Sequence, residues 1–337
     1  MKKEDNKIKV LKSEVLFSNK CIHDNIRNNY LCQLKKRVSA KYEIAIKDIL
    51  PTKRGFFGES WKIVTENNKY FNKLIFWSYH QKRFLDSLDI LTYMITQGIT
   101  FIPTIIKTKD GNNFFSFQNG YGAIFDYIEG DNNEVYPMEL LIEKLLQLYK
   151  LDVSSSNFLS ETFNCDLINI YNELACSNNL SNILQKKLIQ KNLMISRYAR
   201  RLEFFSNICS HDLSGLHLTH GDAGGNCILN GNNLMIVDWD SAQIAPIERD
   251  MWIYFDNETT IHYINSQLMQ TGLNYQLKTE RICYYCYYFF FYYLTEYLKA
   301  IIHTDDKEKK LKIEKETCEY LSENWIYERL KLADRIR

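Results

Sequence analysis

The stretch HGDAGGNCILNGNNLMIVDWD occupies residues 220–240, and the interpretation of the whole chain starts from it. Its two short apolar runs, CIL and LMIV, are separated by NGNN, which is a strong local signal for a β-hairpin. Centring the turn on residues 230–233 places Asn226, before the first strand, opposite Val237 and Asp238, after the second. The hairpin therefore predicts an amide and a carboxylate side by side at its open end.

This pair suits a magnesium ion. The side-chain oxygens of Asn226 and Asp238 are hard ligands, and Mg²⁺ takes few protein ligands because water and substrate phosphates complete its shell. Asp222 lies four residues before Asn226 on a glycine-rich loop, where it is placed to accept a proton from an attacking hydroxyl. We predict Asn226 and Asp238 as metal ligands and Asp222 as the catalytic base; the alternative is a plain turn and cap.

The same residues resemble the catalytic segment of the kinase-like phosphotransferases, which include aminoglycoside and choline kinases. In that superfamily an HGDxxxxN loop precedes a hairpin and an IDW or IDF segment; here HGDAGGN spans 220–226 and IVDWD spans 236–240. The continuation SAQIAPIERDMW, at 241–252, is most similar to the spectinomycin phosphotransferase branch. In one departure, three residues rather than four separate Asp222 from Asn226, and we expect the adjacent glycines to bridge the shorter loop with φ values closed to other residues.

The resemblance implies an α+β, bilobal protein-kinase-like fold with a small β-rich N-lobe and a larger, mainly helical C-lobe. The pattern of the chain is typical of that fold, because the first 128 residues are strand-rich with one principal helix at 79–97, ended by Gly98. We predict a nucleotide-binding lobe with leading helices at 1–128. The predicted C-terminal lobe, 129–337, carries the hairpin and the acceptor site.

A lysine and a turn predict the nucleotide site. In YFNKLIFW, Lys73 is flanked by apolar residues, which favours a central strand and a buried anionic partner over a lysine that snorkels from an edge strand. The superfamily uses a lysine at this strand to hold the α- and β-phosphates of ATP (or GTP). KRGFFGES, at 53–60, is either a phosphate-binding glycine loop or a plain turn. The predicted nucleotide contacts are Gly55, Gly58, Ser60 and, in the segment expected to contact adenine, Asp126, Tyr127 and Ile128.

Several further side chains have predicted supporting roles. The superfamily generally pairs its lysine with a glutamate on the following helix, but YHQKRFLDSLDILTYMITQG contains none, so Asp86 or Asp89 is the candidate. Asp250 is predicted to N-cap the next helix and, by resemblance, to brace the catalytic loop. Asp240 is expected to orient the loop or to face the acceptor, and His220 is expected to be a hydrogen-bonded core residue.

Composition excludes several classes of protein. The 337 residues include 42 Lys plus Arg and 41 Asp plus Glu, so we expect no nucleic-acid partner. Nine irregularly spaced cysteines and an N-terminus without a secretory apolar segment favour a cytoplasmic protein. The aromatic run at 282–302 carries Glu296 and Lys299, which favours a buried helix over a membrane span, and its Cys283 and Cys286 are expected to be buried thiols.

These patterns predict an ATP- and Mg²⁺-dependent O-phosphotransferase that acts on a hydroxyl of a small molecule. An aminoglycoside or aminocyclitol antibiotic is the first substrate expected, and the activity would confer antibiotic resistance. A choline-type or other metabolite kinase has the same core and needs an aromatic cage, for which the tyrosines of 284–297 are available. A catalytically weak binding protein, similar to the spore-coat relatives of this superfamily, is a further alternative.

Overall fold

The structure, a computed structural model, describes residues 24–52, 58–130, 136–255, 258–304, 306–322 and 325–336. The chain divides into two compact units. The sheet unit comprises the described residues of Lys9–Lys144 and Asp222–Ala242, and the helical unit comprises those of Leu145–Gly221 and Gln243–Arg337. The hairpin that carries the predicted catalytic residues therefore belongs to the same unit as the sheet. The predicted domain boundary between residues 128 and 129 stays a prediction.

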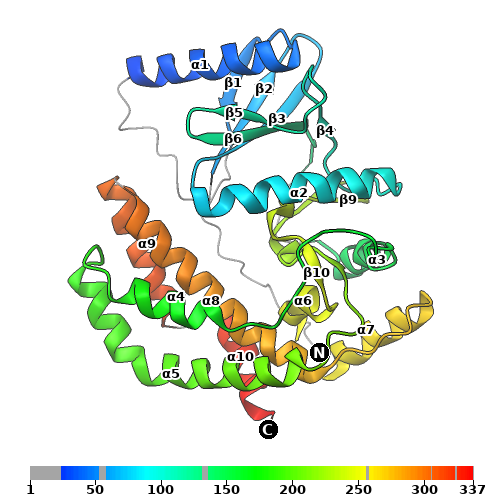
Figure 1. Cartoon of the computed structure of the whole chain (residues 1–337), viewed down its shortest axis with the longest axis vertical. Coiled ribbons are helices and arrows are strands. Elements are labelled where there is room, and N and C mark those ends of the chain that lie inside the picture. The colour runs from blue at the N-terminus through cyan, green and yellow to red at the C-terminus, as the bar shows by residue number, and fades with distance from the viewer. Residues whose placement is uncertain are drawn as a thin grey trace, which may run out of the picture. The chain divides into compact units, whose positions relative to one another are not determined.

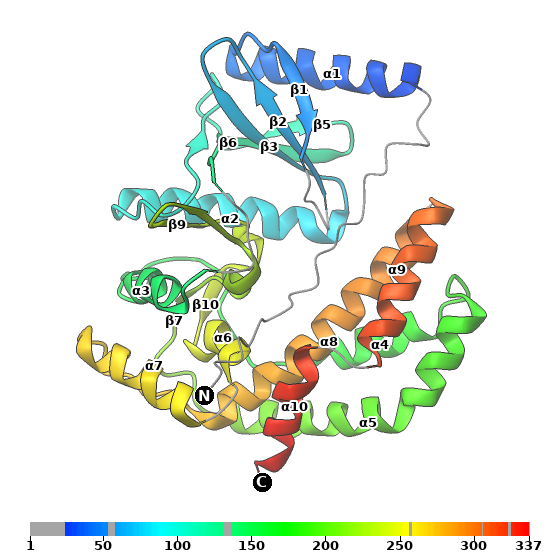
Figure 2. The ribbon, with the colours of Figure 1, turned by 180° about the vertical axis from the view of Figure 1, so that it is seen from behind.

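An antiparallel sheet with strand order β1-β2-β3-β6-β4 organises the sheet unit, and β5 pairs with β6. Helix α1 lies along one side of this sheet and α2 along the other (Figures 1 and 2). A core forms where Leu34 and Val38 of α1 pack with Ile63, Leu74 and Ile124 of the sheet. The bounds of these elements are α1 Asp24–Tyr42, β1 Asp48–Pro51, β2 Glu59–Val64, β3 Lys69–Ile75, α2 Ser78–Thr96, β4 Ile105–Ile106, β5 Phe115–Phe117 and β6 Gly120–Asp126.

Helix α2 confirms the helix expected at 79–97. Its apolar positions, among them Phe84 and Leu88, are buried at the spacing of an amphipathic helix. Gly98 follows the helix with φ +80°, and the N–H of Ile99 donates to the carbonyl of Met94 at 3.1 Å, which is the Schellman arrangement. The glycine therefore ends the helix as the sequence predicts.

Two short helical turns and a hairpin complete the sheet unit. These are the 3₁₀ turn η1, the strands β8 and β9, and the 3₁₀ turn η2. Their bounds are η1 Ala223–Gly225, β8 Cys227–Asn230, β9 Asn233–Ile236 and η2 Trp239–Ser241. Helix α3, Met138–Leu148, begins in the sheet unit and ends in the helical unit. Helix α2 packs against η2, so the segment after the hairpin is held by the helix that follows β3.

Helix α8, Thr279–His303, is the centre of the helical unit, where it packs against α4, α5, α9 and α10 (Figures 1 and 2). Tyr284, Tyr285 and Tyr287 are fully buried, which confirms the prediction of a buried helix. Among the described residues, no helix is both long and apolar enough to cross a membrane. The other elements are α4 Asp166–Ala175, α5 Asn182–Ser210, β7 His217–Thr219, β10 Gln243–Ala245, α6 Glu248–Met251, η3 Trp252–Tyr254, α7 Glu258–Gln270, α9 Lys307–Tyr320 and α10 Trp325–Arg335.

The cysteines of α8 are buried as expected. Cys283 and Cys286 have no solvent exposure. Burial raises the pKa of the Cys283 thiol to about 12, so the thiol stays protonated and unreactive at neutral pH. These residues are part of the core packing of α8.

Candidate active site

The predicted hairpin forms with the predicted register. Cys227 of β8 lies opposite Ile236 of β9, and beyond this pair the N–H of Val237 donates to the carbonyl of Asn226 at 2.8 Å. Gly231 adopts φ +59° in the turn, which a glycine does without steric cost. The base of the hairpin therefore joins Asn226 to the residue before Asp238.

Asp222 and Asn226 are in direct contact. The amide nitrogen Nδ2 of Asn226 donates to the Asp222 carbonyl at 2.8 Å and to Asp222 Oδ2 at 3.1 Å. The N–H of Asn226 donates to the carbonyl of Ala223 at 3.0 Å, which closes the 3₁₀ turn η1. Asp222 is exposed, so its carboxylate is accessible to a substrate.

The shortened loop is bridged differently from the prediction. Gly224 and Gly225 are not among the glycines with positive φ; they lie inside η1, whose tight i→i+3 turn takes up the missing residue. The left-handed glycine is instead Gly221, with φ +83°. The expectation of unusual φ values at the adjacent glycines was therefore wrong.

A buried arginine packs against Gly221. A Cβ atom at Gly221 would lie 2.0 Å from Nη1 of Arg249, so only glycine fits without displacing the guanidinium. Nη1 of Arg249 also donates to Thr219 Oγ1 at 3.1 Å. Sequence reasoning missed this contact, although Arg249 belongs to the ERD triplet that the resemblance had singled out.

The carboxylate of Asp250 accepts hydrogen bonds from the backbone of the predicted catalytic loop, but Asp250 does not cap a helix. Its Oδ2 accepts from the N–H of His220 at 3.1 Å and from the hydroxyl of Tyr149 at 3.0 Å, and its Oδ1 accepts from the N–H of Gly221. Helix α6 begins at Glu248, with Asp250 inside it, so the predicted N-cap was wrong. The bracing is observed, and His220 is fully buried as expected.

Tyr136 holds the loop at its centre. Its hydroxyl donates to the carbonyl of Gly224 at 2.6 Å, which fixes the middle of η1. The thiol of Cys227 donates to the carbonyl of Ala223 at 3.3 Å. Tyr136 gave no signal in the sequence, because it lies 88 residues from its partner.

Lys73 lies on a central strand, as its apolar neighbours predict. Strand β3 is placed between β2 and β6, with Lys73 opposite Ser60 and Ala123. Its Nζ lies 2.6 Å from Asp238 Oδ1 and 2.8 Å from Asp240 Oδ2. The lysine and the predicted metal ligand, 165 residues apart in sequence, are therefore in contact.

The acid partner expected on the following helix is not there. Asp86 forms an ion pair with Lys82 at 2.6 Å, one turn away on α2, and Asp89 is exposed. The acids that contact Lys73 are Asp238 and Asp240, so this part of the prediction was wrong.

The charges of this cluster influence one another. Burial alone would lower the pKa of Lys73, but the carboxylates of Asp238 and Asp240 outweigh it and raise that pKa, so the ammonium stays charged. Burial raises the pKa of Asp240, and the opposing influences include the Lys73 ammonium and His80 of α2. The ammonium of Lys73 thus partly offsets the effect of burial on the pKa of Asp240.

The backbone after β9 turns both acids toward the lysine. Asp238 adopts φ +65°, a left-handed conformation that costs a non-glycine residue about 1–3 kcal/mol. Trp239 anchors the turn: it is buried, and its Nε1 donates to the carbonyl of Ile236 at 2.9 Å. The two aspartates on either side of Trp239 are thereby directed to one ammonium.

The remaining predicted nucleotide residues have identifiable surroundings. A Cβ atom at Gly58 would lie 2.3 Å from the carbonyl oxygen of Leu74, so this glycine allows the backbone to approach β3.

The segment expected to contact adenine follows strand β6. The N–H of Asp126, the last residue of β6, donates to the carbonyl of Thr104 at 3.0 Å. The ring of Tyr127 lies beneath the Lys62 ammonium at 4.0 Å. Ile128 follows and is half-buried, and Gly55 lies outside the described residues. The nucleotide-binding roles of these residues stay predictions.

The donor set at the hairpin base fits a magnesium ion. Asn226 uses its amide nitrogen toward Asp222, and its Oδ1 accepts no hydrogen bond from the described residues. Among the residues that the structure describes, no group of three or more His, Cys, Asp and Glu side chains is arranged to hold a metal. Two protein ligands, Asn226 and Asp238, suit Mg²⁺ because substrate phosphates and water supply the others.

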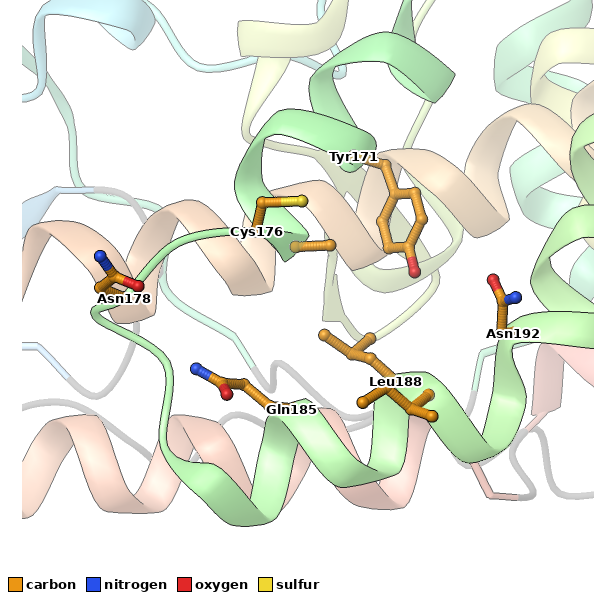
Figure 3. Close-up of a pocket in the computed structure, with 8 residues that line it drawn as sticks. Tyr171, Cys176, Asn178, Gln185, Leu188 and Asn192 are labelled. Atoms are coloured by element: carbon orange, nitrogen blue, oxygen red, sulfur yellow. The ribbon is translucent and has the colours of Figure 1, made fainter.

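Two hollows in the helical unit contain none of the predicted site residues. One, of about 340 Å³, lies between α4 and α5, where Tyr171 and Leu188 face each other (Figure 3). The other, of about 640 Å³, is lined in part by Tyr149, Ser154 and His217. Burial lowers the pKa of His217, whose Nδ1 lies 2.7 Å from the carbonyl of Tyr149.

Solved structures share this fold. Spectinomycin phosphotransferase APH(9)-Ia, solved with ADP and spectinomycin, superposes with a TM-score of 0.69 at 18% identity, over 90% of this chain and 98% of that one. The chain has the fold of the aminoglycoside phosphotransferases. A microcompartment-associated aminopropanol kinase matches with a TM-score of 0.56 at 11% identity, covering 90% of this chain and 97% of that one. The amicoumacin kinase hAmiN matches with a TM-score of 0.54 at 10% identity, covering 91% and 99%.

Sequence comparison adds no relative. Neither the models of protein families nor the curated proteins contain a match to this chain. The solved structures confirm the α+β protein-kinase-like fold that the resemblance in the sequence implies.

Proposed function

We propose that this protein is an ATP- and Mg²⁺-dependent O-phosphotransferase of the cytoplasm that phosphorylates a hydroxyl of a small molecule. One observation carries the proposal. Lys73 contacts Asp238 at 2.6 Å, and Asp238 follows the hairpin base where Asn226 holds Asp222. An ordinary hairpin does not need a buried lysine, a left-handed aspartate and an exposed carboxylate in one unit.

Each of these groups has a task in phosphoryl transfer. Asp222 takes the proton of the acceptor hydroxyl while that oxygen bonds to the γ-phosphorus, and the bond from phosphorus to the bridging oxygen of ADP breaks. Lys73 offers a charged ammonium to the phosphates of the nucleotide. Asn226 orients the Asp222 carboxylate through its amide nitrogen. Asp250 and Tyr136 fix the backbone of the loop that carries the base.

Asn226 Oδ1 and a carboxylate oxygen of Asp238 would hold the magnesium ion. When bound, the ion neutralises charge on the phosphates. The exposure of Asp238, whose side chain is 50% accessible, leaves room for the ion. Asp238 also contacts Lys73, so the proposed metal site and the phosphate site adjoin.

An aminoglycoside or aminocyclitol is the first acceptor to test, because the structure with the TM-score of 0.69 belongs to a protein solved with spectinomycin. The neighbours that include an aminopropanol kinase keep other amino alcohols, choline among them, in the panel. The buried rings of Tyr284, Tyr285 and Tyr287 are core, so they do not form a choline cage. The contacts of Asn226 with Asp222 and of Lys73 with Asp238 favour an enzyme over a catalytically weak binding protein.

The test is ATP turnover coupled to ADP detection, with the purified chain, Mg²⁺, ATP or GTP, and a panel of aminocyclitols, aminoglycosides, amino alcohols and choline. We expect acceptor-dependent ADP release that is lost in Asp222→Asn. The matched control is Asp152→Asn, an exposed aspartate that binds the N–H of Ser154 outside the site. Turnover that is independent of every acceptor, or equal in wild type and D222N, would refute the proposal.

A further inference from the structure

Lys73 has two carboxylate partners in this structure, and they differ in surroundings. Its Nζ contacts Asp238 at 2.6 Å and Asp240 at 2.8 Å. The side chain of Asp238 is 50% exposed, whereas that of Asp240 is 26% exposed and that of Lys73 only 16%. Asp240 is therefore the more enclosed of the two partners.

The proposed function gives Asp238 a second cation to bind. An oxygen of Asp238 that serves a metal ion is a weaker partner for the ammonium, because like charges then approach one carboxylate. Lys73 is largely buried, and a buried ammonium without a counter-ion is strongly destabilised. The carboxylate of Asp240, 2.8 Å from Nζ, provides a counter-ion without movement of the lysine.

Among the described residues, no acid of α2 forms an ion pair with Lys73. Asp86 is paired with Lys82, and Asp89 is exposed. Asp240 lies in η2, which packs against α2 and is anchored by the buried Trp239. Its position is therefore set by the packing of the unit.

We propose that Asp240 is the lasting counter-ion of Lys73 and keeps the ammonium in place when Asp238 binds the metal. This inference rests on the proposed function for the metal and the nucleotide, but the ion pair itself does not. Asp240 is a positioning residue: it acts through Lys73 and contacts neither the metal nor the reacting atoms.

A double-mutant cycle on the whole chain tests the pair without any turnover. Thermal and urea unfolding are measured for wild type, D240N, K73M and K73M/D240N. We expect D240N to destabilise the wild type, because Lys73 loses a partner. In the K73M background we expect D240N to stabilise, because two neighbouring carboxylates lose their mutual repulsion. The coupling should be about tenfold in the unfolding equilibrium constant.

The Mg²⁺ dependence of ADP binding tests whether Asp240 is a counter-ion of Lys73 or a ligand of the metal. The stabilisation by ADP is measured with Mg²⁺ and with EDTA. We expect D238N to abolish the Mg²⁺-dependent part and D240N to retain it. The control is Asp86→Asn, which should leave the cycle and the ADP effect unchanged.

Two results would overturn the inference. Additive effects of D240N and K73M would show that the two residues do not act as a pair. Loss of the Mg²⁺-dependent stabilisation in D240N, as complete as in D238N, would make Asp240 a metal ligand. The proposed function fails separately: a wild type that transfers phosphate to no acceptor refutes the enzyme even where the cycle shows coupling.

Discussion

Asn72, the residue before Lys73, is the site of our most direct stability prediction. It is fully buried on β3, and among the described residues neither its Oδ1 nor its Nδ2 has a hydrogen-bond partner. Its strand neighbours are Trp61 and Ile124, both of the apolar core under α1. A buried donor or acceptor without a partner costs about 1–3 kcal/mol. The amide is therefore a destabilising feature of the sheet unit.

The substitution to make is Asn72→Leu, because leucine has the same branched shape with two apolar terminal atoms. Removing the unmet polar groups should raise the free energy of unfolding by about 1–3 kcal/mol, less some overpacking by the larger methyl groups. For a unit of this size, each kcal/mol raises the unfolding temperature by about 2–4 °C. Urea and thermal unfolding followed by tryptophan fluorescence measure the gain, with Trp61 as a probe opposite the mutated residue.

Asn67→Leu is the matched control, since Asn67 is exposed in the turn between β2 and β3 and should gain no stability. Position 72 alternates with position 73 along the strand and faces away from Lys73. We therefore expect nucleotide binding to be unchanged in N72L. A lower unfolding midpoint in N72L than in wild type would contradict the reasoning, because the amide would then have partners in solution.

Three further substitutions test the site itself. Lys73→Met should lower the phosphotransfer rate by about 10²–10³-fold, since in the proposed function the ammonium is the charged group offered to the phosphates; an unchanged rate refutes its role. Tyr136→Phe removes the hydroxyl that binds the Gly224 carbonyl, and it should slow transfer about fivefold, for about 1 kcal/mol, with the KM for nucleotide unchanged. A fall in nucleotide affinity alone would contradict this. Gly221→Ala forces a side chain onto Arg249 at φ +83° and should cost about 2–4 kcal/mol in urea unfolding; equal stability would show that the arginine moves freely.

The hairpin could be predicted because everything that fixes it is local. The NGNN turn and the short apolar run on either side of it determine which residues lie opposite each other, so the position of Asn226 beside Val237 follows from sequence. The end of α2 at Gly98 is local for the same reason, because only the backbone freedom of one residue is involved. Periodicity and turn chemistry act over a few residues, and here they suffice.

The partners of the charged residues could not be predicted in this way. Lys73 contacts Asp238 across 165 residues, and no pattern near β3 distinguishes Asp240 from Asp86 as its partner. The analogy to a helix-borne glutamate directed attention to α2, but Asp86 pairs with Lys82 there and Lys73 pairs with Asp238 and Asp240. Such contacts depend on how η2 packs, which a linear pattern does not contain.

The formal charges of the cluster give a reason for a lysine and two aspartates to lie together beside the proposed metal site. By formal charge, Lys73 contributes one positive charge and Asp238 and Asp240 contribute one negative charge each, so the three side chains sum to −1 when all are ionised. A negative cluster attracts a divalent cation, and the sum then becomes +1, which favours a polyphosphate. Without Asp240 the cluster would be neutral before the cation arrives, and the attraction would be weaker. The second aspartate thus makes the lysine compatible with a cation beside it, which a single ion pair would not do.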